Sequence, residues 1–193
     1  KCISCVDGEG AIDGVKFSVG DSLFVPAGYG EFTVTGNATL IISEVRKYYI
    51  GIDIGGTFIK GGIVDDTGNI IIEDKIPSSH DEEEIINAIA ELCNGMLTAV
   101  NLNKSDVVGI GMGVPGMIDE RNGEVVYSNN LGWEKFKIAE RLHEKTGLPV
   151  KISNDANVAA LAEVKFGCAK GFKNAVMITL GTGVGSGIII DGR

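Results

Sequence analysis

The 193-residue sequence is poor in basic residues and in histidine, and it has no long apolar run. It holds 17 lysines and arginines against 26 acidic residues, which gives a net charge of −9, and it has two histidines. An acidic chain argues against a nucleic-acid surface, so a phosphorylated ligand would be held by backbone amides, a metal and a few cations. Since no stretch could span a bilayer and no signal peptide is visible, we expect a cytoplasmic protein without a membrane partner.

Cysteine is also scarce, at positions 2, 5, 93 and 168. Cys93 and Cys168 stand in apolar contexts that look helical, which suits a reducing, cytoplasmic compartment. Cys2 and Cys5 have the spacing of half a metal site, but no second pair follows. Residues three apart in a strand face opposite ways, so strand packing is favoured over a metal or redox role.

Composition is that of a globular protein, with 44% hydrophobic and 22% charged residues. Residues 1–46 carry short alternating apolar runs broken by glycine turns, which predict antiparallel β-structure. The runs are Ile3–Val6, Val15–Val19, Ser22–Val25, Glu31–Val34 and Thr39–Val45. Lys1 is not an initiator and Asp191-Gly192-Arg193 is a turn signal, so we expect a piece of a longer polypeptide.

The stretch Tyr48–Asp65 organises the rest of the chain. A strand ending at Asp53 is followed by Gly55-Gly56-Thr57 and a second strand, Phe58–Val64. Paired glycines allow positive φ and can bring backbone N–H groups up to an anion. Asp53 would then stand beside that anion and near a metal ion; the alternative is an ordinary tight hairpin.

A second glycine turn, residues 181–187, joins the apolar runs Ala175–Leu180 and Ile188–Ile190. Between the two hairpins, hydrophobic periodicity predicts alternating helices and strands. They are a strand over Ile70–Ile76, a helix over Asp81–Val100, a buried parallel strand over Val107–Val114, a helix over Glu134–Lys145, a strand over Val150–Ser153 and a helix from Asn154 to Phe166.

Asn154 and Asp155 allow two interpretations. Asn154 is a good N-cap and Asp155 a good first-turn acid, which explains both structurally. An Asp at the same strand-to-helix edge could also take the proton of an attacking hydroxyl. Asn130 could bind a sugar hydroxyl or hold its own turn. We expect Trp133 to be a packing residue at a helix start, and His80 and His143 to be surface residues rather than catalysts.

Five motifs in order give residues 48–193 a resemblance to the ROK family of sugar kinases and repressors. They are the first hairpin, Gly111-Met112-Gly113-Val114-Pro115-Gly116, Asn129-Asn130-Leu131-Gly132-Trp133, Asn154-Asp155 and the second hairpin. The resemblance implies an α/β fold, an actin/hexokinase-like (ribonuclease H-like) domain that is incomplete at its C-terminus. It also implies ATP and Mg²⁺ as cofactors and a hexose substrate.

By this resemblance the residues take the following roles. Asp155 would be the catalytic base, and Gly116, Asn130, Asn154 and Asp155 would line the sugar. The phosphates would be held by Asp53, Gly55, Gly56, Thr57, Lys60, Gly181, Thr182 and Gly183, with Asp53 near Mg²⁺. Kinases of the family carry a Glu-x-Gly-His segment and a Cys-rich zinc loop further on; the sequence contains neither, so zinc ligands are absent from this chain.

Residues 1–46 resemble the C-terminal cupin end of class I mannose-6-phosphate isomerases, through Gly20-Asp21 and Pro26-Ala27-Gly28. They would form a short all-β half-barrel, which would have a small hydrophobic core and unpaired strand edges. The segment holds no histidine, so an isomerase site cannot be assembled from it.

We therefore expect a domain of residues 1–46 and another of residues 48–193, in a glucokinase-like sugar kinase whose 193-residue piece has low activity. Two alternatives stay open. One is a non-catalytic sugar sensor of the ROK repressor type, and the other is a mannose-6-phosphate isomerase with an appended kinase fragment. The sequence does not identify the sugar, and it is compatible with a homodimer.

Overall fold

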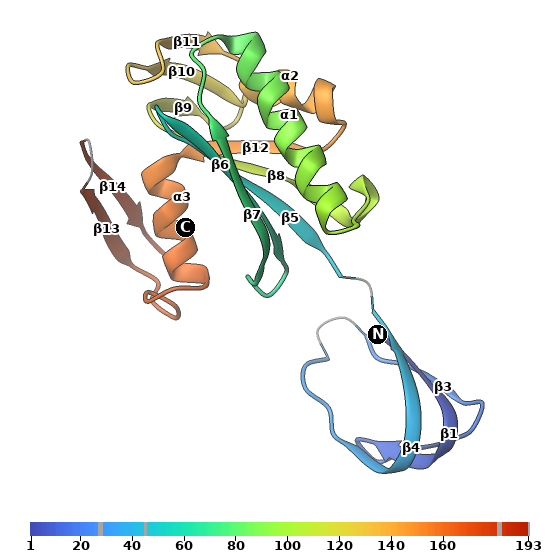
Figure 1. Ribbon diagram of the computed structural model, residues 1–193. Coiled ribbons are helices and arrows are strands. Elements are labelled where there is room, and N and C mark those ends of the chain that lie inside the picture. The colour runs from blue at the N-terminus through green and yellow to red at the C-terminus, as the bar shows by residue number, and fades with distance from the viewer. Residues whose placement is uncertain (27–28, 45, 181–182, 193) are drawn as a thin grey trace. The chain divides into compact units, whose positions relative to one another are not determined.

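The computed structural model describes residues 1–26, 29–44, 46–180 and 183–192. The chain divides into two compact units, Lys1–Arg46 and Lys47–Arg193, each drawn in Figure 1.

The first unit is an antiparallel sheet built on one long strand, β1 (Cys2–Ile12). β4 (Val34–Ser43) pairs along one edge of β1, while β2 (Val15–Ser18) and β3 (Ser22–Phe24) share the other. The predicted antiparallel β-structure is confirmed. The separate strand predicted over Glu31–Val34 is wrong, because β4 begins at Val34 and runs on without a break.

Glycines that looked like strand breaks lie inside β1 and β4. A Cβ on Gly8 would lie 2.1 Å from the carbonyl oxygen of Asn37, and one on Gly36 would lie 2.5 Å from Cα of Gly10. These glycines therefore permit two backbones to approach closely rather than ending the strands. The small core consists of Ile3, Cys5, Ile12, Phe17 and Val25. Cys5 is buried and Cys2 exposed, as expected for opposite faces of a strand.

The second unit is organised around a five-stranded sheet in the order β12-β8-β5-β6-β7. The strands are β5 (Tyr48–Ile54), β6 (Phe58–Asp65), β7 (Ile70–Pro77), β8 (Val107–Val114) and β12 (Val150–Asn154). β5, β6 and β7 form an antiparallel meander, and β8 lies parallel to both β5 and β12. The predicted first hairpin, third strand and buried parallel strand are confirmed.

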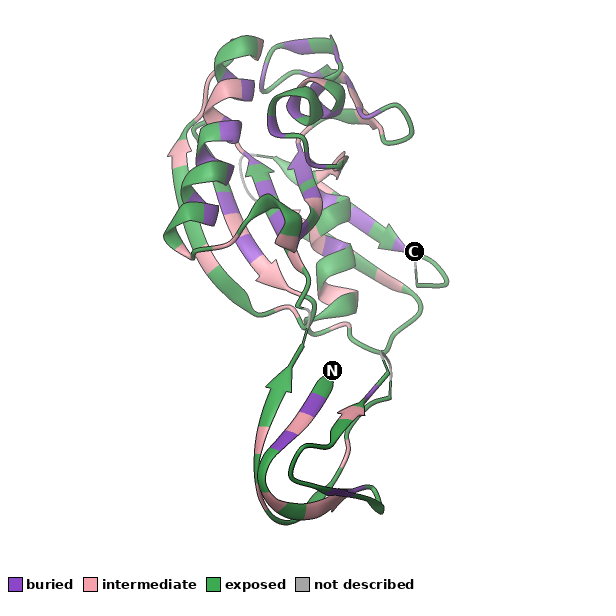
Figure 2. Cartoon of the chain, turned by 90° about the vertical axis from the view of Figure 1, so that its right-hand side faces the viewer, coloured by how far each residue is buried: buried purple, intermediate pink, exposed green. Residues whose placement is uncertain are grey.

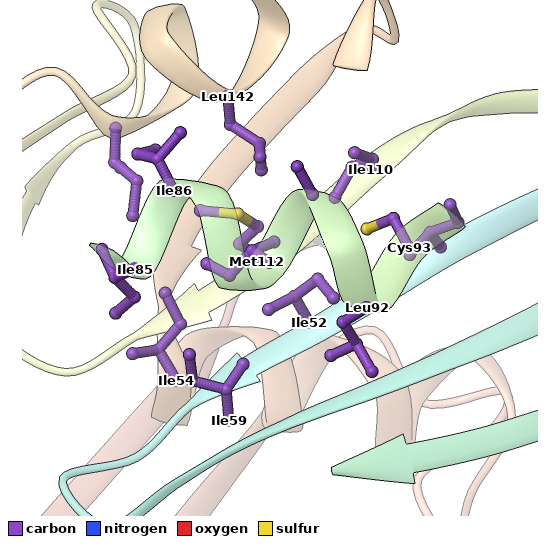
Figure 3. Packing of buried hydrophobic residues seen from close by; sticks show 14 of the residues in the cluster. Ile52, Ile54, Ile59, Ile85, Ile86, Leu92, Cys93, Ile110, Met112 and Leu142 are labelled. Atoms are coloured by element: carbon purple, nitrogen blue, oxygen red, sulfur yellow. The ribbon is translucent and has the colours of Figure 1, made fainter. Parts of the chain in front are cut away.

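Helix α1 (Glu82–Ala99) covers one face of this sheet. Asp81 caps it by accepting hydrogen bonds from the backbone N–H groups of Glu83 and Glu84. Figure 3 shows its apolar side chains meeting those of the strands, and Figure 2 shows the buried residues gathered between helix and sheet. Ile85, Ile89, Ile50, Ile59 and Ile63 are fully buried there. A Cβ on Gly61 would lie 2.9 Å from both Leu92 and Met96, so glycine lets β6 approach the helix closely.

The chain between β8 and α2 (Ile138–Thr146) forms a small sheet that the sequence analysis did not predict. Its strands are β9 (Met117–Asp119), β10 (Glu124–Ser128) and β11 (Trp133–Phe136), in the order β11-β10-β9. The helix predicted to start at Glu134 therefore starts four residues later, at Ile138. Lys135 has φ of 53°, which no α-helix accommodates. Trp133 is a buried packing residue as expected, but in a strand rather than at a helix start.

Helix α3 (Asp155–Lys165) follows β12 and starts on the face of the sheet opposite α1. Successive strand residues alternate between the faces, so Asp53 and Gly113 point away from the α1 side, where Ile52 and Met112 are buried. β13 (Ala175–Leu180) and β14 (Val184–Ile189) form an antiparallel hairpin against α3. A Cβ on Gly187 would lie 2.5 Å from Cβ of Ala160, so small residues on both sides permit this packing.

All four cysteines are free thiols. Cys93 is buried in α1, which matches the predicted helical context, and burial raises the pKa of its thiol to about 12. Cys168 lies beyond the end of α3 and is exposed, so the helical context predicted for it is wrong. Lys104–Asp106 form a short 3₁₀ turn before β8. Among the described residues, no helix has the length and apolar character of a membrane span.

Candidate active site

A groove of about 580 Å³ opens where β5, β8 and β12 end. Both glycine hairpins contribute to it, and so do the start of α3 and the loop before β11. Its lining residues are Asp53, Ile54, Gly55, Gly56, Pro115, Asn130, Asn154, Asp155, Ala156, Thr179, Leu180, Gly183, Val184, Gly185 and Ser186. The structure thus brings together most of the site residues that the sequence singled out, from positions up to 130 residues apart.

Asp155 lies at the first turn of α3 and its carboxylate is exposed to the groove. Asn154 caps the helix, because its Oδ1 accepts hydrogen bonds from the N–H groups of Ala156 at 3.0 Å and Asn157 at 3.4 Å. One oxygen of Asp155 also accepts from Ala156 N–H, at 2.9 Å. These interactions at the helix start hold the carboxylate at the rim of the groove.

Asp53 stands on the neighbouring strand, across Gly113 from Asp155. A Cβ on Gly113 would lie 3.4 Å from Cα of Asp155 and 3.9 Å from Oδ1 of Asp53. Partial burial raises the pKa of the Asp53 carboxyl; Lys60 works against this shift, and the charge of Asp155 adds to it. The two acidic groups therefore share one region of the groove, where the charge of Asp155 disfavours ionisation of Asp53.

A bound cation would relieve this repulsion. Mg²⁺ is usually held by one or two carboxylates together with waters and substrate phosphates. Asp53 and Asp155 fit that pattern in residue type and placement. In the described part of the chain, no group of three or more histidine, cysteine and acidic side chains forms an all-protein metal cage.

The tip of the first hairpin differs from the expectation in two ways. Neither Gly55 nor Gly56 takes a positive φ. The N–H of Gly55 closes the turn by donating to the carbonyl of Phe58 at 3.0 Å, so it is not free for an anion. The amides of Gly56 and Thr57 donate to no other described residue. A Cβ on Gly55 would lie 2.9 Å from the Phe58 oxygen, so glycine here provides room.

Three of the predicted residues lie outside the lining of the groove. Thr57 is exposed and its carbonyl accepts from Ser78 N–H at 2.9 Å. Lys60 pairs with Asp53 across β5 and β6 and borders a separate depression on β6 and β7. Gly116 has φ of 124°, and a Cβ there would lie 2.4 Å from the carbonyl oxygen of Tyr127. Gly116 instead supports the site, because its carbonyl accepts from Asn154 Nδ2 at 3.1 Å.

The second hairpin is described only in part. Gly181 and Thr182 lie outside the described residues, while Gly183 lines the groove. Thr179, Leu180 and Ser186 line it too and were missed by the sequence analysis. Thr179 is the one polar residue of β13 and lies near its glycine-turn end, which is the sequence signal that could have found it.

Asn130 lines the groove from a loop that is anchored on both sides. Leu131 is fully buried, and Trp133 is 2% exposed. Trp133 packs edge-on against Phe136, with ring centroids 5.0 Å apart. Its Nε1 donates to the carbonyl of His80 at 3.0 Å. The placement of Asn130 thus depends on packing that is remote from the groove itself.

Sequence comparison assigns most of the chain to one family. The ROK family profile matches residues 49–193. The chain belongs to the ROK family. Residues 1–45 match the cupin domain of mannose-6-phosphate isomerase. Both resemblances predicted from the motifs are confirmed.

Relatives include enzymes and regulators. A glucokinase from Halalkalibacterium halodurans is 40% identical over 149 residues, which are 76% of this chain and 45% of that protein. A xylose repressor from Bacillus spizizenii is 33% identical over 153 residues, 79% of this chain and 40% of that protein. The chain therefore spans less than half the length of these relatives.

Solved structures confirm the fold. A ROK family glucokinase from Streptomyces griseus, in complex with glucose and AMPPNP, has a TM-score of 0.69 at 36% identity. The alignment covers 76% of this chain and 45% of that one. The predicted actin/hexokinase-like α/β class is therefore confirmed for the second unit.

Proposed function

We propose that this ROK chain takes part in the ATP-dependent phosphorylation of a hexose hydroxyl, with Asp155 as the base. The observation that carries the proposal is the single groove into which both glycine hairpins, Asn130 and Asp155 open. The glucokinase relatives support the reaction class. The chain aligns with 45% of the Halalkalibacterium halodurans glucokinase, so we expect low turnover from these 193 residues alone.

Asp155 would orient the sugar hydroxyl and accept its proton as the oxygen attacks the γ-phosphorus. The new O–P bond forms while the bond from phosphorus to the β-phosphate oxygen breaks, and ADP leaves with that electron pair. Because the N–H of Ala156 holds the carboxylate in place, its main contribution would be to orient the hydroxyl.

Asn130 and Asn154 would hydrogen-bond other sugar hydroxyls, with Asn154 itself held by Gly116. The amides of Gly56 and Thr57 would face the phosphates from one hairpin, where Gly55 closes the turn and leaves room for it. Gly181, Thr182 and Gly183 would act on the phosphates from the other. Lys60 would act through the field it exerts on Asp53. Mg²⁺ held by Asp53, with Asp155 close by, would neutralise phosphate charge.

The test measures phosphorylated product from ATP, Mg²⁺ and a panel of glucose, mannose, fructose and N-acetylhexosamines. The chain and a longer polypeptide containing it are assayed in parallel, each with an Asp155→Asn variant. We expect Asp155→Asn to lower turnover about 10²- to 10⁴-fold while circular dichroism and Tm stay close to those of the parent. Product formation that survives this substitution would show that Asp155 is not the base.

The xylose repressor relatives support a second candidate, a sugar sensor without catalysis. A sensor would bind a sugar, measured by calorimetry, and form no phosphorylated product with any nucleotide. For the first unit we propose the fold of a cupin end and no isomerase chemistry, since it contains no histidine. Isomerisation of mannose 6-phosphate by the chain would overturn that view.

A further inference from the structure

The connection between β7 and α1 joins two parts of the candidate site. The N–H of Ser78 donates to the carbonyl of Thr57, at the tip of the first hairpin, over 2.9 Å. Two residues later, Nδ1 of His80 lies 3.0 Å from the carbonyl oxygen of Leu131. The carbonyl of His80 in turn accepts from Nε1 of Trp133 at 3.0 Å. We call these two bonds of His80 with Leu131 and Trp133 the His80 clasp.

The His80 clasp contacts the loop that carries Asn130 through residues that do not line the groove. Asn130, which lines the groove, immediately precedes Leu131, whose side chain is fully buried. His80 therefore holds the backbone of the residue next to Asn130, while Trp133 fixes the far end of the loop. Figure 1 shows α1 beginning beside β11, which is where the two segments meet.

The contact between His80 Nδ1 and the carbonyl oxygen of Leu131 determines which ring nitrogen carries the hydrogen. A carbonyl oxygen can only accept, so Nδ1 must carry the hydrogen that it donates to Leu131. The imidazole thus donates a hydrogen bond through Nδ1, and its Nε2 takes no part in the contact with Leu131.

We infer that His80 is a positioning residue for the sugar-binding loop, an inference that rests on the proposed function. By holding Leu131, it sets the distance and direction from which Asn130 reaches a sugar hydroxyl. His80 itself touches neither sugar nor phosphate. Loss of its side chain would weaken hexose binding and leave nucleotide binding unchanged.

The chain provides a matched control. His143, the other histidine, makes the same kind of contact, with Nδ1 2.8 Å from the carbonyl oxygen of Leu148. It lies in the last turn of α2, outside the lining of the groove. His143→Ala removes an equivalent hydrogen bond without touching the Asn130 loop.

The experiment measures Kd for a hexose from the panel and Kd for ATP by calorimetry, on the full chain and on variants. For His80→Ala we expect the hexose Kd to rise about three- to ten-fold, the range of one net hydrogen bond, and the ATP Kd to stay constant. His80→Asn should restore binding, because its amide nitrogen occupies the place of Nδ1; His80→Gln, with its nitrogen one bond further out, should not. His143→Ala should bind both ligands as the parent does.

Trp133, the single tryptophan, provides an independent readout, because its Nε1 donates to the backbone carbonyl of His80 and so reports on any displacement of that backbone once the ring no longer anchors it to Leu131. Emission should shift to the red and quenching by acrylamide should increase in His80→Ala, but not in His80→Asn or His143→Ala. An unchanged hexose Kd in His80→Ala, with the parent binding hexose, would overturn the role of His80 alone. Failure of the parent to bind any hexose would overturn the proposed function, and the role of His80 with it.

Discussion

Asp53 and Asp155 approach each other over the bare backbone of Gly113. A methyl group at that position would meet Cα of Asp155 at 3.4 Å and Oδ1 of Asp53 at 3.9 Å. These are ordinary van der Waals distances, so a methyl group fits, but a larger side chain would fill the space between the carboxylates. The absence of a side chain there keeps the region between two strands and a helix open to a ligand.

This arrangement predicts a graded effect of size at position 113. Gly113→Ala should fold normally and keep most ligand binding, whereas Gly113→Val should fold yet lose ATP binding at least about ten-fold, since its methyl groups occupy the shared space. Calorimetric titration with Mg·ATP and thermal unfolding test both. Gly111→Ala is the control, because a Cβ at Gly111 would have no heavy atom within 4 Å and would approach neither carboxylate. Equal affinities for Gly113→Val and the parent would contradict the assigned location.

The second prediction concerns the raised pKa of Asp53. Because the folded protein holds a proton on this group more tightly than the unfolded chain does, ionised Asp53 costs stability at neutral pH. That cost disappears as the pH falls through the folded-state pKa. In EDTA at pH 7, Asp53→Asn should therefore raise the free energy of unfolding, by ~0.5 kcal/mol, and the difference should vanish in acid.

Urea unfolding at a series of pH values measures this difference. Asp66→Asn, in an exposed turn, serves as the control and should follow the parent at every pH. If Asp53→Asn is less stable than the parent at pH 7, the surroundings of Asp53 do not disfavour its charge, and the direction of its pKa shift has been assigned wrongly.

The third prediction separates the two functions of the Asn154 side chain. Asn154→Ala loses both the helix cap and the bond to Gly116, and should lower the free energy of unfolding by about 1–2 kcal/mol. Asn154→Asp keeps a capping oxygen and loses only the donor to Gly116, so it should retain most of the stability. Both should weaken hexose binding. Comparable destabilisation of the two variants in urea would show that the cap contributes little.

The fourth prediction tests the packing of β14 on α3. A Cβ at Gly187 would lie 2.5 Å from the backbone oxygen of Ala156, which cannot move without shifting the helix. Gly187→Ala should therefore destabilise the second unit by about 1–3 kcal/mol and displace the second hairpin from the groove. Gly95→Ala is the control, because Gly95 lies in α1 with open space around it. This substitution should leave the free energy of unfolding unchanged or raise it slightly. Thermal unfolding followed by circular dichroism distinguishes these outcomes.

Sequence reasoning succeeded where periodicity and caps agreed. The alternation in Tyr48–Asp65, the apolar face of α1 and the Asn154 cap each follow from local chemistry, and the structure contains all three. The convergence of Asp53, Asn130 and Asp155 could be expected only through the family resemblance. Nothing local in the sequence specifies that their strands end at one edge.

The failures have specific causes. Trp133 and Phe136 are three residues apart, which suits a helix face, but the left-handed conformation of Lys135 places them in a strand. Glycines at positions 8 and 36 looked like turns, although they serve close contact between two long strands. Whether Thr57 and Lys60 act on phosphate depends on tertiary placement, and their positions outside the lining could not be read from sequence.

The small sheet β9–β11 has a consequence for how specificity can change. Asp53, Gly113 and Asp155 are fixed by neighbouring strands of the central sheet, whose spacing is set by backbone hydrogen bonds. Asn130 lies instead in the segment between β8 and α2, whose strands β9, β10 and β11 pair only with one another among the described strands. Insertions and substitutions in that segment can therefore reshape the recognition of a ligand while the acidic pair stays in place.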